Sequence, residues 1–195
     1  MDAVHTAPSR AIERPRLVAV GSALAATGVA MYFAGLIGVY LFDRAQVLHS
    51  GGDWLSKVTI PLTPPNVMML TLVFSCVTMQ WALYAVARND RTHAFLALGV
   101  TLLFAAAVVN SQFWMYQQMQ LVVAQTMQAV LIYAITGSFL ALLVSAAVYL
   151  AAVTFRTLGG QYGPHQHDGI VGAAIYWYVM VAVYAVIWIA VYVTK

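Results

Sequence analysis

Long uninterrupted apolar runs dominate the chain. Five stretches contain no Asp, Glu, Lys or Arg: residues 17–41, 66–87, 94–116, 125–155 and 170–193. Each exceeds the ~20 residues that a helix with a rise of about 1.5 Å per residue needs to cross a hydrocarbon core of about 30 Å. None alternates apolar and polar residues as barrel strands do. The pattern predicts an all-α, polytopic bundle of five transmembrane helices.

The composition also indicates that the chain lies in a membrane. Hydrophobic residues make up 63% of the 195 residues and charged residues 8%, whereas soluble domains carry about 25% charged residues. The chain therefore has too little polar surface to cover a soluble core, and its solvent is lipid. We expect a polar cytoplasmic leader over residues 1–16 and a single membrane domain over 17–195. Because the leader has no small-residue cleavage site before a short apolar core, the first span is predicted to be retained.

The Lys and Arg residues predict the orientation. With the N-terminus inside the cell, Arg44, Lys57 and Lys195 lie outside. The other cationic residues then lie in the cytoplasm: Arg10, Arg14, Arg16, Arg88, Arg91 and Arg156. The excess of inner cations favours an N-in, C-out topology. The net charge of +3 is then an orientation signal and needs no nucleic-acid partner.

Turn-forming residues separate the apolar runs. Gly51 and Gly52 follow the first run, Arg88-Asn89-Asp90-Arg91 separates the second from the third, and Gly159 and Gly160 follow the fourth. Glycine and Asn-Asp pairs are typical of tight connections. They predict short loops between neighbouring helices.

Small residues mark a candidate helix-packing face on the first span. Gly21, Ala25 and Gly28 share a face at spacings of three and four residues, and Gly35 and Gly38 lie further along. Such faces let another backbone approach closely in membranes. The partner is either a helix of another subunit or a helix of this chain, and the sequence favours neither. A similar pattern occurs in the fourth span at Gly137, Ala141 and Ser145.

Two groups of polar and aromatic residues allow alternative interpretations. The first is Asn110, Ser111, Gln112, Gln117 and Gln118. It could bond a neighbouring subunit, but we favour a solvated helix end. The second is Trp177, Tyr178, Tyr184, Trp188 and Tyr192. It could form a quinone-sized wall, but we favour an interfacial belt with ordinary packing.

Candidate chemistry is sparse. His165, His167 and Asp168 have metal-ligand residue types, with His93 as one conceivable addition, but zinc sites ordinarily need three or four convergent ligands. We therefore favour a connecting loop. Cys76 is the only cysteine and is expected to be a small buried side chain. We assign no catalytic, cofactor or metal residue to this chain, because no acid-base pair or activated nucleophile lies within the spans.

The order of these features resembles a known family. Arg14-Pro15-Arg16 leads into Met31-Tyr32-Phe33-Ala34-Gly35-Leu36, and a loop with Gly51-Gly52-Asp53-Trp54 follows. The turn at 88–91, Gln112 and Tyr116 in the third span, and Tyr176-Trp177 and Tyr192 in the fifth keep the same spacing. This arrangement is similar to the five-helix bacterial form of cytochrome c oxidase subunit III. The resemblance covers residues 14–195.

The sequence departs from that family at its buried ionisable positions. Val29 and Met115 occupy positions where the family carries glutamate, in the first and third spans. Two histidines that follow Thr-Gly in the family correspond to Phe139 and Leu142, and a histidine and an aspartate of the fifth span correspond to Tyr178 and Val181. All six residues are neutral. Because a charge at mid-membrane costs about 2.5–3.5 kcal/mol and persists only for a task, we expect these positions to be degenerate.

The resemblance implies an accessory, non-catalytic subunit of a respiratory haem-copper (aa3-type) oxidase in the bacterial inner membrane. Such a subunit stabilises catalytic subunit I, contacts further subunits and holds lipid, while haem and copper reside in the partner subunits. Phospholipid is the one ligand that the resemblance implies for this chain. A subunit-III-like protein of a nitric oxide reductase or another membrane complex is the alternative. A small transporter or a free-standing lipid-binding protein is disfavoured, because neither interrupted helices nor intramembrane charges are visible.

Overall fold

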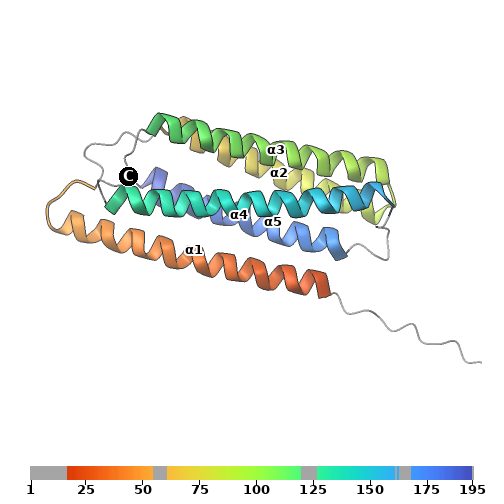
Figure 1. The fold of residues 1–195 in the computed structure, drawn as a ribbon, viewed down its shortest axis with the longest axis horizontal. Helices are drawn as coiled ribbons and strands as arrows, with labels where there is room; N and C mark the ends of the chain where they lie inside the picture. The colour runs from red at the N-terminus through yellow and green to blue at the C-terminus, as the bar shows by residue number, and fades with distance from the viewer. Residues whose placement is uncertain (1–16, 55–60, 120–126, 161, 163–167, 195) are drawn as a thin grey trace, which may run out of the picture.

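The protein is a bundle of five long helices (Figure 1). The computed structural model describes residues 17–54, 61–119, 127–160, 162 and 168–194. Its helices are α1 (Leu17–His49), α2 (Thr63–Ala87), α3 (Arg91–Met119), α4 (Met127–Leu158) and α5 (Asp168–Ile187), and the π-helix η1 (Trp188–Val193) continues α5. Each of the five spans is long and apolar enough to cross a membrane. The prediction of an all-α, five-span membrane protein is confirmed, and the described residues contain no strand.

The helix bounds differ from the apolar runs mainly at their ends. α1 continues past residue 41 through Asp43 and Arg44 to His49, since a helix can extend beyond the hydrocarbon into the interface. The polar leader, residues 1–16, lies outside the described residues. The division into a leader and a membrane domain therefore stays a prediction, as does the N-in orientation.

α5 lies at the centre of the packing. It contacts α1, α2 and α4, while α2 pairs with α3 and α3 with α4. α1 and α3 form opposite edges of the bundle in Figure 1, with α4 and α5 between them. α5 has the largest share of buried residues among the spans, and α1 has the smallest. One large side of α1 is therefore left uncovered by the other described residues.

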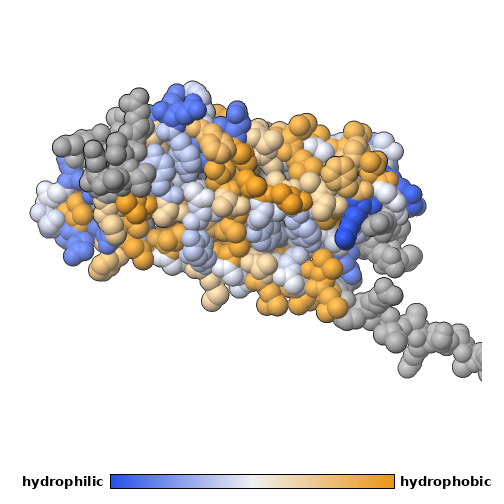
Figure 2. Space-filling model, in the orientation of Figure 1, coloured by the Kyte–Doolittle hydropathy of each residue, from blue (hydrophilic) through white to orange (hydrophobic). Residues whose placement is uncertain are grey.

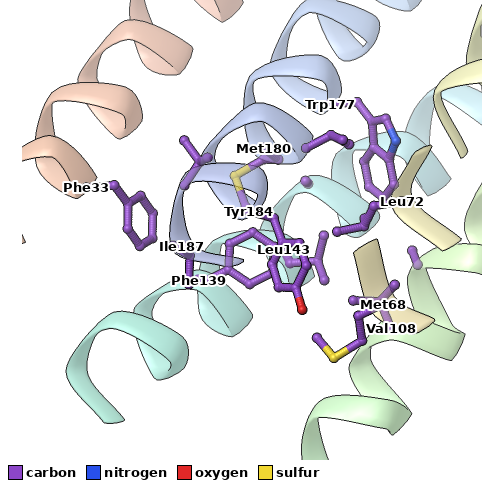
Figure 3. Packing of buried hydrophobic residues seen from close by; sticks show 14 of the residues in the cluster. Phe33, Met68, Leu72, Val108, Phe139, Leu143, Trp177, Met180, Tyr184 and Ile187 are labelled. Carbon is purple, nitrogen blue, oxygen red and sulfur yellow. The ribbon is translucent and has the colours of Figure 1, made fainter. Parts of the chain in front are cut away.

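Figure 3 shows the core around α5. Trp177, Met180, Tyr184 and Ile187 of α5 lie among Phe33, Leu72 and Phe139, which come from α1, α2 and α4. The ring of Phe139 lies 5.0 Å from that of Tyr184 and 6.4 Å from that of Phe33. Because lipid is as apolar as these side chains, the bundle is stabilised by close packing and hydrogen bonds between helices more than by exclusion from solvent.

The turn between α2 and α3 is built from its backbone hydrogen bonds. Asn89 has φ 59°, its N–H donates to Val86 O at 2.9 Å, and Asp90 N–H donates to Ala85 O at 2.9 Å. This pair of bonds closes a helix C-terminus around a left-handed residue, a conformation that asparagine tolerates. The prediction of a tight turn at residues 88–91 is confirmed.

Candidate functional site

One face of α1 packs within the bundle. Ala19, Ala26, Phe33 and Tyr40, seven residues apart, are buried together with Ile37. Tyr40 accepts a hydrogen bond from Trp54 Nε1 at 3.1 Å, so the segment after α1 folds back onto this face. This stripe supplies the intramolecular contacts of α1, chiefly with α5.

The small residues of α1 lie on the opposite face. Gly21, Gly28 and Gly35 each follow a residue of the buried stripe by two positions, which is a rotation of about 200° around an α-helix. A Cβ built at Gly21, Gly28, Gly35 or Gly38 would meet no described atom within 4 Å, and Ala25 is exposed. We call Gly21, Ala25, Gly28, Gly35 and Gly38 the α1 glycine face. Among the described residues, no helix of this chain packs closely on these glycines, although Gly21 and Ala25 border a groove that α4 and α5 also line.

The close approach of α1 and α5 instead depends on Gly172. A Cβ at Gly172 would lie 2.6 Å from Ser22 Oγ and 2.9 Å from Tyr149 Oη. The α5 backbone can therefore lie beside these two hydroxyl groups only because residue 172 has no side chain. Sequence reasoning missed this residue, although Gly169-Ile170-Val171-Gly172-Ala173-Ala174 is a run rich in small residues at the start of the span.

A groove of approximately 410 Å³ lies where α1, α4 and α5 meet. Its lining consists of Val18, Gly21, Ser22, Ala25, Ser145, Tyr149 and Tyr176. Ser22 Oγ and Tyr149 Oη lie 3.3 Å apart, and Tyr149 donates to Gly169 O at 3.3 Å. Because these hydroxyls are hydrogen-bonded, the groove is a mostly apolar surface. It adjoins the α1 glycine face at Gly21 and Ala25.

Figure 2 shows the side of the molecule on which α1, α4 and α3 lie. Hydrophobic residues extend along its length, and the strongly hydrophilic residues gather toward its two ends. Between α1 and α4, the hydroxyls of Tyr32 and Ser138 form a 2.8 Å hydrogen bond. Because these two hydroxyls bond each other, a bilayer or a second protein helix can cover this pair at little cost.

The six neutral positions named from the resemblance are packing positions in the structure. Met115, Phe139 and Val181 are buried in the core, while Val29 and Leu142 are partly buried and pack against it. They lie on α1, α3, α4 and α5. The fully buried polar side chains of the described residues are uncharged groups, namely the hydroxyls of buried tyrosines and the side chains of Ser75, Thr101, Gln112, Thr136, Thr154 and Thr157. Among the described residues, no Asp, Glu, His, Lys or Arg side chain is fully buried in this interior.

Tyr178, the sixth position, connects α5 to α2. Its hydroxyl donates to Gln80 Oε1 at 2.9 Å. The other aromatic candidates have separate partners on α2: Trp177 Nε1 donates to Ser75 Oγ at 2.9 Å and Trp188 Nε1 to Asn66 Oδ1 at 2.8 Å. Since Trp177, Tyr184 and Tyr192 are buried in the core, these side chains fasten α5 to its neighbours and do not form a shared wall for a quinone.

The polar group at the end of α3 divides into two kinds of residue. Asn110, Gln117 and Gln118 are exposed, as expected for a helix end, and Ser111 is half-buried. Gln112 is 1% exposed. The prediction of a solvated end is therefore wrong for Gln112, because this position faces the other helices of the bundle.

The metal candidates remain apart or undescribed. His165 and His167 lie outside the described residues. His93 Nδ1 lies 2.7 Å from Asp90 Oδ2, so the His93 ring is paired with the carboxylate that caps α3. In the part of the chain that the structure describes, no group of three or more His, Cys, Asp and Glu residues could hold a metal ion. Cys76 is half-buried and packs against the core.

Comparisons with known proteins give one family. The family model described as Cytochrome c oxidase subunit III matches residues 15–195. Cytochrome c oxidase subunit 3 of Corynebacterium diphtheriae is 25% identical over 195 residues, covering 96% of this chain and 92% of that protein. Cytochrome c oxidase subunit 3 of Strongylocentrotus purpuratus is 25% identical over 167 residues, covering 84% of this chain. This chain spans 64% of the length of that protein. The similarity thus extends through all five spans.

Proposed function

This chain belongs to the cytochrome c oxidase subunit III family, and we propose that it is an accessory, non-catalytic subunit of a respiratory haem-copper (aa3-type) cytochrome c oxidase. The observation that carries the proposal is the uncharged interior of a five-span bundle whose sequence matches this family from residue 15 to residue 195. Catalysis and proton transfer need ionisable groups of suitable pKa. In the proposal, haem, copper and proton transfer belong to the partner subunits.

The proposed role of this subunit is to stabilise catalytic subunit I by packing beside it. The α1 glycine face is our candidate docking surface, since its glycines have open space around them. A helix of the partner could approach the α1 backbone closely there and gain van der Waals contacts and weak C–H···O bonds. Because the core stripe of α1 is on the other side, docking would need no rearrangement of the bundle.

Lipid is the ligand that we propose for the groove between α1, α4 and α5. Its volume of approximately 410 Å³ and its apolar walls suit part of an acyl chain. The polar groups in its lining include the hydroxyls of Ser22, Tyr149 and Tyr176, and none of its lining residues carries a charge that a lipid chain would have to cover. The role of such a lipid would be to fill the seam beside the proposed docking surface.

We further propose that the protein is a multi-pass protein of the bacterial inner membrane with its N-terminus in the cytoplasm. The bacterial relative, of which the chain covers 92%, supports a bacterial setting. Arg88, Arg91 and Arg156 lie at one end of the bundle, and by the positive-inside rule this charge distribution supports a cytoplasmic location for that end. No relative quoted above favours a nitric oxide reductase partner, and each is named as a subunit of cytochrome c oxidase.

The experiment is purification of the tagged chain in mild detergent, followed by visible spectroscopy and identification of the co-purifying proteins. The proposal predicts haem absorbance and an oxidase catalytic subunit in the same particle. The matched control is the same purification from cells that lack the gene for the catalytic subunit, which should give the chain without haem. Recovery of the folded chain alone, from wild-type cells in several mild detergents, would contradict the proposal.

A further inference from the structure

Three arginines lie at the end of the bundle where α2 turns into α3 and where α4 ends (Figure 1). They are Arg88 after α2, Arg91 at the start of α3 and Arg156 in the last turn of α4, and all three are exposed. Within the described ranges, none of them makes a hydrogen bond or an ion pair. Asp90, which lies between two of them in the turn, is paired with His93 at 2.7 Å. The three guanidinium groups are therefore available to an anion from outside the described residues.

Arg91 lies against the C-terminal end of α4. A Cβ at Gly160, where φ is +71°, would come within 2.8 Å of Arg91 Nη1. The guanidinium group of α3 thus lies over a stretch of α4 backbone that has no side chain. Arg156 lies about one turn before Gly160 in the same helix end. The junction of α3 and α4 therefore brings two arginines from different helices together.

Aromatic side chains indicate that this end lies at the headgroup level of a bilayer. Trp81 and Tyr84 of α2 are both exposed, and Trp and Tyr residues of this kind are enriched at the membrane–water interface. Arg88 stacks over the Tyr84 ring, with its guanidinium carbon 4.1 Å from the ring centroid. Stacking engages the flat face of a guanidinium group, and its N–H groups still point outward at the edge. The arginines are thus at the depth at which lipid phosphates lie.

Apolar side chains continue from this junction toward the middle of the spans. Phe155 and Leu158 of α4 are 72% and 63% exposed, and Leu96 of α3 is 50% exposed. α3 and α4 are neighbours that run in opposite directions and meet at Arg91 and Gly160. Leu96 and Phe155 are each five residues from that meeting point, which is about 7.5 Å along either helix. A lipid would use both the cations and this hydrocarbon surface, whereas a free inorganic anion would use the cations alone.

We propose that Arg91 and Arg156 bind the phosphate of an anionic phospholipid at the junction of α3 and α4. Arginine suits this ligand because its planar group donates two parallel N–H bonds to a phosphate. Arg88 adds positive charge beside the site, and the acyl chains lie against Leu96 and Phe155. Basic sites between membrane helices commonly bind anionic headgroups. This site is separate from the groove between α1, α4 and α5, and it does not depend on the proposed place of the chain in an oxidase.

The test is reconstitution of the purified protein, with the subunits that accompany it, into nanodiscs of phosphatidylcholine alone or with added phosphatidylglycerol. A ligand that binds only the folded state raises its Tm, so phosphatidylglycerol should raise the Tm of the wild type. Arg91→Gln should lose most of this gain and should match the wild type in phosphatidylcholine, which shows that its fold is intact. Arg44→Gln removes the same charge at the opposite end of the bundle and should keep the gain. A full gain in Arg91→Gln, or an equal loss in Arg44→Gln, would overturn the proposal.

The phosphatidylglycerol retained per chain through purification is a second readout. It should fall roughly fivefold in Arg91→Gln, the factor usual for one cationic side chain near an anionic membrane surface. Inorganic phosphate added to phosphatidylcholine nanodiscs distinguishes a lipid from a free anion and should leave the Tm unchanged. A Tm gain with inorganic phosphate equal to that with phosphatidylglycerol would overturn the lipid assignment. Loss of accompanying subunits from Arg91→Gln at unchanged lipid content would overturn it too, because the arginine would then bind a protein.

Discussion

Gly172 of α5 lies so close to Ser22 of α1 that a Cβ at residue 172 would come within 2.6 Å of Ser22 Oγ. This contact sits at the end of the bundle where Tyr149 of α4 joins the same hydroxyl at 3.3 Å. Three helices thus meet at a position without a side chain. α1 is held to the bundle by this approach and by its buried stripe, and the glycines of the α1 glycine face have no close contact with other described residues.

Gly172→Ala should therefore weaken the attachment of α1. The added methyl group must displace Ser22 Oγ and Tyr149 Oη, and overpacking of this kind costs roughly 1–3 kcal/mol. The expected result is a Tm lower by about 2–4 °C per kcal/mol in the purified chain. Gly21→Ala is the matched control, since a Cβ there meets no described atom within 4 Å. Equal effects of the two substitutions would refute the packing described for Gly172.

Large side chains on the α1 glycine face should impair docking and leave the fold intact. Gly28→Leu and Gly35→Leu fill space that is open in the isolated chain. The free energy of unfolding of the chain should therefore change by less than about 0.5 kcal/mol. The amount of catalytic subunit that co-purifies should fall severalfold.

Ala106→Leu, an exposed position on α3 at the opposite edge of the bundle, controls for added bulk and should leave that amount unchanged. Normal co-purification of the two glycine variants would show that the partner binds another surface.

The cap of α3 should depend on pH. The backbone N–H of His93, which donates to Asp90 Oδ1 at 3.2 Å, is the main cause that holds the pKa of Asp90 below its ordinary value. Folding therefore favours the ionised carboxylate of Asp90. Its contribution to the stability of the folded chain is complete above the ordinary carboxyl pKa of about 4, and it is lost as the pH falls through the lower pKa of the folded state.

The measurement is the Tm difference between the wild type and Asp90→Ala at a series of pH values. It should be largest near neutral pH and shrink as the solution is acidified below about pH 4. Asp90→Asn, which retains a capping oxygen without a charge, should keep its difference from Asp90→Ala across the series. A wild-type advantage that grew toward low pH would contradict this account of the cap.

The orientation can be tested with single cysteines. In a Cys76→Ala background, Thr92→Cys at the start of α3 and Asp53→Cys after α1 are both exposed positions, at opposite ends of the bundle. An impermeant thiol reagent applied to intact cells with a permeabilised outer envelope should label residue 53 and spare residue 92. Labelling of residue 92 alone would reverse the proposed topology.

The sequence predicted the number of spans because length and charge alone decide whether a helix can cross a membrane. It also identified the turn at Asn89, where backbone conformation favours a short list of residues. It could not identify which side of α1 packs inward, since α1 is apolar all around and both Phe33 and Gly35 suit a membrane helix. Gln112 was misjudged for a related reason: its burial depends on neighbouring helices, and its side chain is equally suited to a solvated end.

The π-helix was missed because its cause is also not local. Residues 188–193 read as a continuation of the α-helical run, and their irregularity accompanies two contacts with other helices, Trp188 with Asn66 and Tyr192 with the surroundings of Gln112. The role of Gly172 depends likewise on Ser22, which is far away in the sequence. Pairwise packing between distant segments is the part of the fold that composition and periodicity leave undetermined.

The central claim is that this subunit acts by packing and has no ionisable group at work in its interior. The most direct measurement compares Val29→Glu with Val29→Leu for the yield of intact complex and for oxidase activity per catalytic subunit. Val29 packs against the core, so a carboxyl group there must be desolvated or stay protonated, at a cost of about 2.5–3.5 kcal/mol near mid-membrane. We expect Val29→Glu to lower the yield and Val29→Leu to assemble normally. Normal assembly of Val29→Glu with raised activity would show that residue 29 is a dormant functional position, and it would contradict the account of a purely structural subunit.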